Sequence, residues 1–246
     1  MLTQSMERSI EFTKMRANEI IENTPLFSYK GSVSKLLGLT VEVNLPGLKI
    51  GDLCFIETSA GERKAAEVVA FKGEYAQLLL LYDGAGICQG SLVQSTGKPI
   101  IVPMGDFLLG RIISPLGEPI DGKPLDTTGA TWMTVDNPPP DAFDRPIITQ
   151  KFSCGVRAID SLLTLGGGQR MGLFAGSGVG KSTLLGMIAR NSDADVNVVA
   201  LIGERGREVK EFVEDALGPE GMAKSVLVCS TGDQPPLIRQ KCLHTA

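Results

Sequence analysis

Histidine is nearly missing from this chain of 246 residues, which has a single one, His244. Any mechanism that needs several histidines is therefore excluded. The five cysteines are odd in number and contain no C-x-x-C pair, which argues against a zinc site and a disulfide framework, so we expect buried free thiols. Long hydrophobic runs are missing too: aliphatic runs such as Leu78 to Leu81 are far shorter than the ~20 residues of a membrane helix.

The chain also has no excess of positive charge. Its 24 lysines and arginines are outnumbered by 28 aspartates and glutamates, for a net charge of −4. Without a broad basic surface, we expect no nucleic-acid partner. Charged residues interrupt the N-terminal segment and leave no room for a signal peptide, so we expect a cytoplasmic protein. Hydrophobic residues make up 43% of the chain, which is typical of a folded protein.

Three regions differ in pattern. Apolar residues at roughly helical spacing predict an amphipathic helix over residues 1–25, which either packs on its own protein or docks a partner. Residues 26–95 contain short β-prone runs separated by glycines, a pattern that predicts a small β-barrel. Residues 96–246 form the third domain. Beyond the stiff stretch Pro138–Pro140, strands and helices alternate there.

This alternation predicts a parallel α/β sheet, because each strand is followed by a helix that returns the chain to the same edge. In the second helix, Val209, Phe212, Val213 and Ala216 follow the i, i+3, i+4, i+7 rule and should lie on the sheet. The predicted strands are residues 171–174, 196–202 and 225–229, and the predicted helices are residues 182–190 and 207–217.

The strongest motif is a glycine-rich loop between the first of these strands and its helix. It reads Ala175-Gly176-Ser177-Gly178-Val179-Gly180-Lys181-Ser182 and continues with Thr183. Backbone N–H groups of such a loop surround phosphates, and the helix N-terminus adds its positive dipole end. Lys181 is placed to reach the β- and γ-phosphates, and Ser182 to bind Mg²⁺. Ala175 stands where the pattern has glycine, at little cost if its backbone angles are ordinary.

Hydrolysis also needs a group that activates water. Glu204 follows the next strand, and because the carboxyl ends of parallel strands share one edge, it can face the loop. Arg205 could compensate the charge that develops on the γ-phosphate. The alternative is that both are helix-start charges exposed to solvent. We assign the remaining charged residues of this helix to its solvent face: Arg207, Glu208, Lys210, Glu211, Glu214 and Asp215.

Two runs carry a family resemblance, residues 169–183 around the loop and Ala200 to Val209 around Glu204. Together with Leu109-Gly110-Arg111, Pro119-Ile120-Asp121-Gly122 and residues 155–160 (GVRAID), they closely resemble the ATPases of flagellar export and type III secretion, relatives of the catalytic subunit of the rotary ATP synthase. The resemblance covers about residues 26–246. Gly206 follows the export pattern.

The resemblance implies an α/β RecA-like P-loop ATPase core, with a parallel sheet that is incomplete at the C-terminus, preceded by the β-barrel. It implies ATP and Mg²⁺ as cofactors, Lys181 as the P-loop lysine, Glu204 as the catalytic glutamate and Arg205 as a phosphate contact. Further implications are a homohexamer, a regulatory stator protein docked on the N-terminal helix, export substrates with their chaperones, and a place peripheral to a membrane export gate, at the inner face of the cell membrane. Lys241 stands where relatives usually have a phosphate-contacting arginine, and it lacks the bidentate fork.

Family members continue beyond Ala246 with further site residues, so we expect this chain alone to hydrolyse ATP poorly. The main hypothesis is an ATP-hydrolysing motor subunit for protein export. One alternative is a non-catalytic nucleotide-binding module that docks partners. Another is a Rho-like RNA translocase, which the acidic composition disfavours.

Overall fold

The computed structural model describes residues 14, 29–176 and 178–246. The helix predicted over residues 1–25 thus lies outside the described residues, apart from Lys14. The chain divides into two compact units. The first comprises the chain up to Leu80 together with Gly84–Lys98, and the second comprises Leu81–Asp83 together with Pro99–Ala246.

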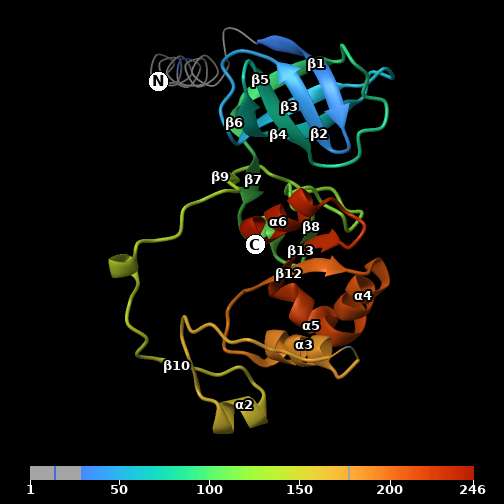
Figure 1. Ribbon diagram of the computed structural model, residues 1–246. Coiled ribbons are helices and arrows are strands. Elements are labelled where there is room, and N and C mark those ends of the chain that lie inside the picture. Colours follow the sequence, from blue (N-terminus) through green and yellow to red (C-terminus); the bar gives the residue numbers. More distant parts are fainter. Residues whose placement is uncertain (1–13, 15–28, 177) are drawn as a thin grey trace, which may run out of the picture. The chain divides into compact units, whose positions relative to one another are not determined.

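The first unit is a closed barrel with the strand order β1-β2-β5-β4-β3-β6 (Figure 1). Its strands are β1 (Lys30–Leu37), β2 (Thr40–Asn44), β3 (Asp52–Glu57), β4 (Arg63–Lys72), β5 (Tyr75–Leu80) and β6 (Leu92–Pro99). Burial alternates along β2, β3 and β5, so that every second side chain enters the core, among them Val41, Cys54 and Leu78. The predicted barrel is confirmed.

The sequence pattern does not predict β6, which completes the barrel. This strand pairs with β1, and the Thr96 hydroxyl donates a hydrogen bond of 2.9 Å to the Leu53 carbonyl on β3. It runs a few residues past the boundary predicted at residue 95. Polar residues and Gly97 weaken its alternation, so its position depends on the pairing partners rather than on local pattern.

The second unit contains a parallel sheet in the order β12-β13-β8. Two antiparallel pairs, β7 with β9 and β10 with β11, lie outside it. The strands are β7 (Ile101–Met104), β8 (Ile112–Ile113), β9 (Thr131–Thr134), β10 (Lys151–Phe152), β11 (Leu165–Gly166), β12 (Asn197–Glu204) and β13 (Ser225–Thr231). The helical elements are η1 (Asp106–Leu108), η2 (Ala142–Asp144), α2 (Arg157–Leu162), α3 (Lys181–Asn191), α4 (Gly206–Glu211), the π-helical η3 (Phe212–Leu217), α5 (Gly218–Ala223) and α6 (Pro236–Thr245).

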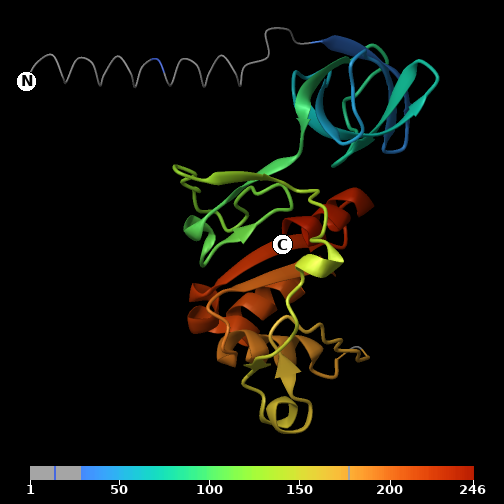
Figure 2. The same cartoon turned by 90° about the vertical axis from the view of Figure 1, so that its left-hand side faces the viewer.

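Helices cover both faces of this sheet, as Figures 1 and 2 show. On one face, Leu201 and Leu227 pack with Phe212 and Leu217 from the α4–η3 segment. On the other, Val228 packs with Cys242 of α6. Strand β13 is buried along nearly its whole length, as a central parallel strand must be. The predicted α/β sheet and the amphipathic second helix are both present.

One predicted strand is wrong. Residues 171–174 form no strand, and Phe174 is almost fully exposed. A strand exists only where a neighbour completes its backbone hydrogen bonds, and in the described part of the chain no strand pairs with this run. Apolar content alone therefore gave the wrong assignment.

Candidate functional site

The glycine-rich loop runs directly into α3. Gly178 and Gly180 have φ angles of 78° and 94°, in the left-handed region that favours glycine, and Gly180 is the N-cap of the helix. Ala175 is not among the residues with positive φ, so its methyl group introduces no backbone strain. Helix α3 begins at Lys181, and its free N–H groups and Lys181 together make this end positive. Ser177 lies outside the described residues.

Lys181, Ser182 and Glu204 line one cavity of about 260 Å³. The apolar residues Leu185, Leu201, Phe212, Met171 and Leu173 also line this cavity. A cation, a hydroxyl and a carboxylate thus line one cavity together with apolar side chains, although they come from α3 and from the end of β12. The sequence pattern predicted this juxtaposition from a strand before the loop, but residues 171–174 form none, so Glu204 stands at the end of β12 whereas the loop follows irregular chain.

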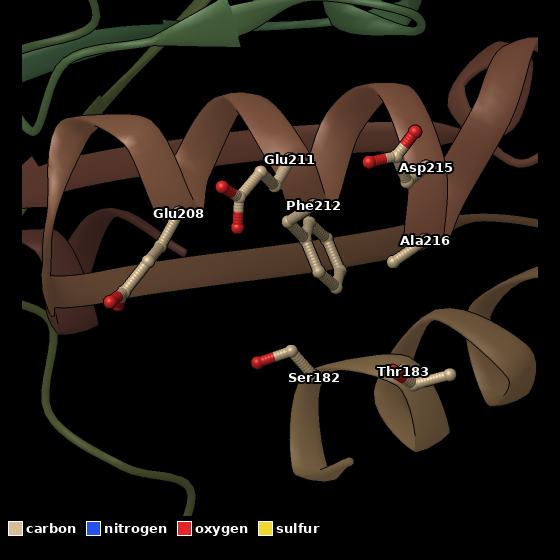
Figure 3. Close-up of a pocket in the computed structure, with 7 residues that line it drawn as sticks. All are labelled: Ser182, Thr183, Glu208, Glu211, Phe212, Asp215 and Ala216. Atoms are coloured by element: carbon tan, nitrogen blue, oxygen red, sulfur yellow. The ribbon is translucent and has the colours of Figure 1, made fainter. Parts of the chain in front are cut away.

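Other predicted site residues lie elsewhere. Arg205 is the N-cap residue of α4 and does not line the cavity. Its side chain is 73% exposed, and its Nη1 lies 3.9 Å from Oε1 of Glu208. Val179, on the loop, is largely exposed. Thr183 lines a neighbouring cavity of about 310 Å³ (Figure 3).

Three acidic residues assigned to the solvent face of the second helix also line a cavity at the start of α3, although Glu211 and Asp215 are exposed as predicted. Glu208, Glu211 and Asp215 line the neighbouring cavity together with Ser182 and Thr183 (Figure 3). Glu208 also lines the first cavity. Glu208 precedes the buried Phe212 by four residues and is therefore its neighbour along one side of the helix, a spacing that could have identified Glu208.

Lys241 forms an ion pair with Asp136. It is buried on α6, and its Nζ lies 2.6 Å from Oδ2 of Asp136, whose other oxygen lies 2.7 Å from Nδ1 of His244. Burial would raise the pKa of Asp136, but hydrogen bonds with Lys241 and His244 outweigh it and lower the pKa. Lys241 therefore does not line the cavity that holds Lys181.

The remaining motif residues hold the local backbone. Arg111 makes a two-pronged ion pair with Asp121, at 2.6 and 2.9 Å. This guanidinium, as the main cause, lowers the pKa of Asp121 well below its usual range. Asp160 accepts the backbone N–H groups of Cys154 and Gly155 at 2.9 and 3.0 Å, which lowers its pKa. These motifs are recognisable because they fix turns.

Comparisons with known proteins bear on this site. Residues 155–246 match the family model "ATP synthase alpha/beta family, nucleotide-binding domain". The chain is 47% identical over 230 residues to the flagellum-specific ATP synthase of Bacillus subtilis (strain 168), covering 93% of this chain and 52% of that protein. It is 42% identical over 215 residues to the type 3 secretion system ATPase of Xanthomonas euvesicatoria, covering 87% of this chain and 48% of that protein.

A solved structure is similar as well. The assembled ATPase EscN from the enteropathogenic E. coli type III secretion system is 41% identical, with a TM-score of 0.76 over 87% of this chain and 51% of that chain. The agreement confirms the predicted fold class, a barrel followed by a P-loop nucleotide-binding domain. The chain spans about half the length of the curated relatives it matches.

Proposed function

Since this chain is a relative of the flagellum-specific ATP synthases and type 3 secretion system ATPases, as its motifs predicted, we propose that it is the nucleotide-binding part of a subunit that hydrolyses ATP to energise protein export through a flagellar or type III secretion apparatus. The observation that carries this proposal is the cavity shared by Lys181 and Glu204. This cavity brings the phosphate-binding side chain of Lys181 and the proposed base, Glu204, together.

ATP would bind with its phosphates at the N-terminus of α3. The loop from Gly176 to Gly180, with Ser177 among its residues, would supply backbone N–H groups, and Lys181 would neutralise phosphate charge. Pockets for whole small molecules measure roughly 300 to 1,000 Å³. The cavity of about 260 Å³ lies below that range, so only phosphate groups next to Lys181 and Ser182 would enter it, and the base and ribose would stay outside.

The donors present also fit Mg²⁺. Within the described ranges, no group of three or more acidic, histidine or cysteine residues could hold a metal by itself. Mg²⁺ does not require one, because it usually keeps several waters and binds one or two carboxylates plus substrate phosphates. Ser182 would be the direct protein ligand, with Glu208 on the same cavity wall. The ion would supply charge neutralisation at the phosphates.

Glu204 would act as the general base. It is half-buried at the end of β12 and reaches the cavity beside the phosphate-binding groups, where it can accept a proton from an attacking water. Arg205 would contact the γ-phosphate after leaving Glu208. Breaking the ion pair with Glu208 would cost little free energy, because the Arg205 side chain is exposed and the two charged groups are 3.9 Å apart.

The partners form part of the proposal. One solved relative is described as an assembled ATPase, and a second structure, with a TM-score of 0.77, shows it in complex with its central stalk EscO. By analogy, this protein would form a homohexamer, dock a stator protein through residues 1–25, receive export substrates with their chaperones, and bind no nucleic acid. In the described part of the chain, no helix has the length and hydrophobicity to span a membrane. We place the protein in the cytoplasm, peripheral to the export gate.

A non-catalytic nucleotide-binding module is the second candidate, because Arg205 does not line the cavity and its side chain is exposed. The experiment that separates the two measures ATP binding and steady-state phosphate release on one preparation of the complete gene product. Binding with turnover supports the motor subunit. Binding without turnover supports the module.

A further inference from the structure

A backbone irregularity lies at the end of β12, immediately before Glu204. Strands β12 and β13 pair in parallel register as far as Ile202 opposite Ser230, but the next pair is Glu204 opposite Thr231. Two residues on β12 thus correspond to one step on β13, which makes Gly203 the extra residue of a β-bulge. Gly203 has a φ of 74°, a conformation that residues other than glycine rarely adopt.

The bulge changes the face to which Glu204 belongs. Side chains along a strand alternate between its two faces. Leu201 packs with Phe212 on the face of α3 and η3, whereas Ala200 packs with Cys242 of α6 on the opposite face. If the alternation ran unbroken through Gly203, Glu204 would share the face of Ala200 and Ile202. Because Gly203 is an extra residue in the pairing with β13, Glu204 instead lines the same cavity as Leu201 and Lys181.

The neighbouring loop holds this arrangement in place. The Gly232 N–H, just beyond β13, donates a hydrogen bond of 3.1 Å to the carbonyl oxygen of Glu204. A Cβ atom on Gly232 would come within 3.1 Å of the Gly203 carbonyl oxygen, so a side chain there would crowd the bulge. Gly232 therefore lies in close contact with the bulge, and its N–H group holds the backbone of Glu204, the residue after Gly203.

We propose that Gly203 is a positioning residue for ATP hydrolysis. Its left-handed conformation creates the bulge, and the bulge moves the Glu204 carboxylate from the face of the sheet covered by α6 to the face with the cavity lined by Lys181 and Ser182. This inference rests on the proposed function, in which Glu204 is the base. Gly203 itself provides no chemical group, so its effect must pass entirely through the orientation of Glu204.

The test is a set of variants of the complete gene product, assayed for turnover and for binding of a fluorescent ATP analogue. Gly203→Ala penalises the positive φ and should reduce kcat by about tenfold or more, since small misplacements of reacting groups can cost up to about 10²-fold. Analogue binding should stay within about twofold, because the phosphate-binding groups on α3 are unchanged. Gly203→Asn should retain more activity, since asparagine tolerates the left-handed region.

Gly129→Ala is the matched control. Gly129 has a φ of 77° with open space around it, and it lies outside the cavity lining, so the same strain should leave kcat unchanged. In a Glu204→Gln background, the Gly203 substitutions should have no further effect on single-turnover rate. If Gly203→Ala does not fold, Gly203→Asn is compared instead, with and without the Glu204→Gln substitution.

Two results would overturn the inference: parental kcat in Gly203→Ala, or a defect of either Gly203 variant that persists undiminished without the Glu204 carboxylate. Parental turnover in Glu204→Gln alone would instead refute the proposed role of Glu204. The two failures are thus distinguishable.

Discussion

Nζ of Lys241 on α6 lies 2.6 Å from Oδ2 of Asp136, a residue 105 positions earlier in the chain. The lysine side chain is 5% exposed and that of the aspartate 45% exposed. This pair ties the C-terminal helix to the segment that follows β9. Lys241 is therefore a structural residue here, although the resemblance assigns its position to a phosphate contact.

We expect Asp136→Asn to destabilise the second unit by about 1 to 3 kcal/mol, between the values for exposed and for buried ion pairs. The substitution removes the acidic partner of a buried ammonium group. Chemical denaturation followed by circular dichroism measures the change. Asp141→Asn, at an exposed aspartate that makes no side-chain cap, is the control and should be neutral. Equal stabilities of the two variants would contradict the assignment.

Acid should destabilise the protein through Asp121. The pKa of this carboxyl is lowered in the folded state by Arg111, so its stabilisation is present above its unfolded pKa of ~3.9 and is lost as the pH falls below that value toward the folded pKa. Asp121→Asn should therefore lose less unfolding free energy between pH 7 and pH 3 than the parent. Parallel curves for the two proteins would show that the ion pair does not contribute.

Cys88 should react with thiol reagents much faster than the other four cysteines. Cys88 is exposed, whereas Cys54, Cys154, Cys229 and Cys242 are buried. Burial raises the pKa of Cys54 and of Cys242 to about 11, and that of Cys229 to about 12, so their thiolates are scarce at pH 8. Ellman's reagent should label one thiol rapidly in the native protein and all five in denaturant. A Cys88→Ser variant should lose the rapid phase; a remaining rapid phase would place another thiol at the surface.

Lys181→Ala should abolish binding of a fluorescent ATP analogue at micromolar concentration, because the phosphates lose the P-loop cation. The fold should survive, since Lys181 is exposed at the start of α3. Lys210→Ala is the control, because Lys210 is exposed on α4 and lines neither cavity. Undiminished binding by the Lys181 variant would show that the loop is not the nucleotide site.

The sequence was sufficient for features that depend on local pattern. Short β-prone runs separated by glycines predicted the barrel, and the glycine-rich motif placed Lys181 at the start of a helix. Features that depend on distant partners were not predictable. Residues 171–174 are apolar but have no pairing strand in the part of the chain that the structure describes, and Lys241 pairs with a residue 105 positions away.

In the candidate site, too, local pattern predicted some features, whereas others depend on distant parts of the chain. Glu204 could be placed at the sheet edge because it directly follows an apolar strand run, residues 196–202. The bulge that gives Glu204 its final orientation depends on register with β13, which periodicity does not encode. Glu208 was missed because a charged residue in a helical run is usually solvated, whereas here α3 packs close enough to share a cavity with it.

The most direct test of the account is Glu204→Gln in the complete gene product, with ATP-analogue binding and phosphate release measured on the same sample. The amide keeps the shape of the side chain but cannot accept a proton from water. We expect binding within about twofold of the parent and turnover reduced by about 10²-fold or more. Parental turnover in this variant would contradict the assignment of Glu204 as the base.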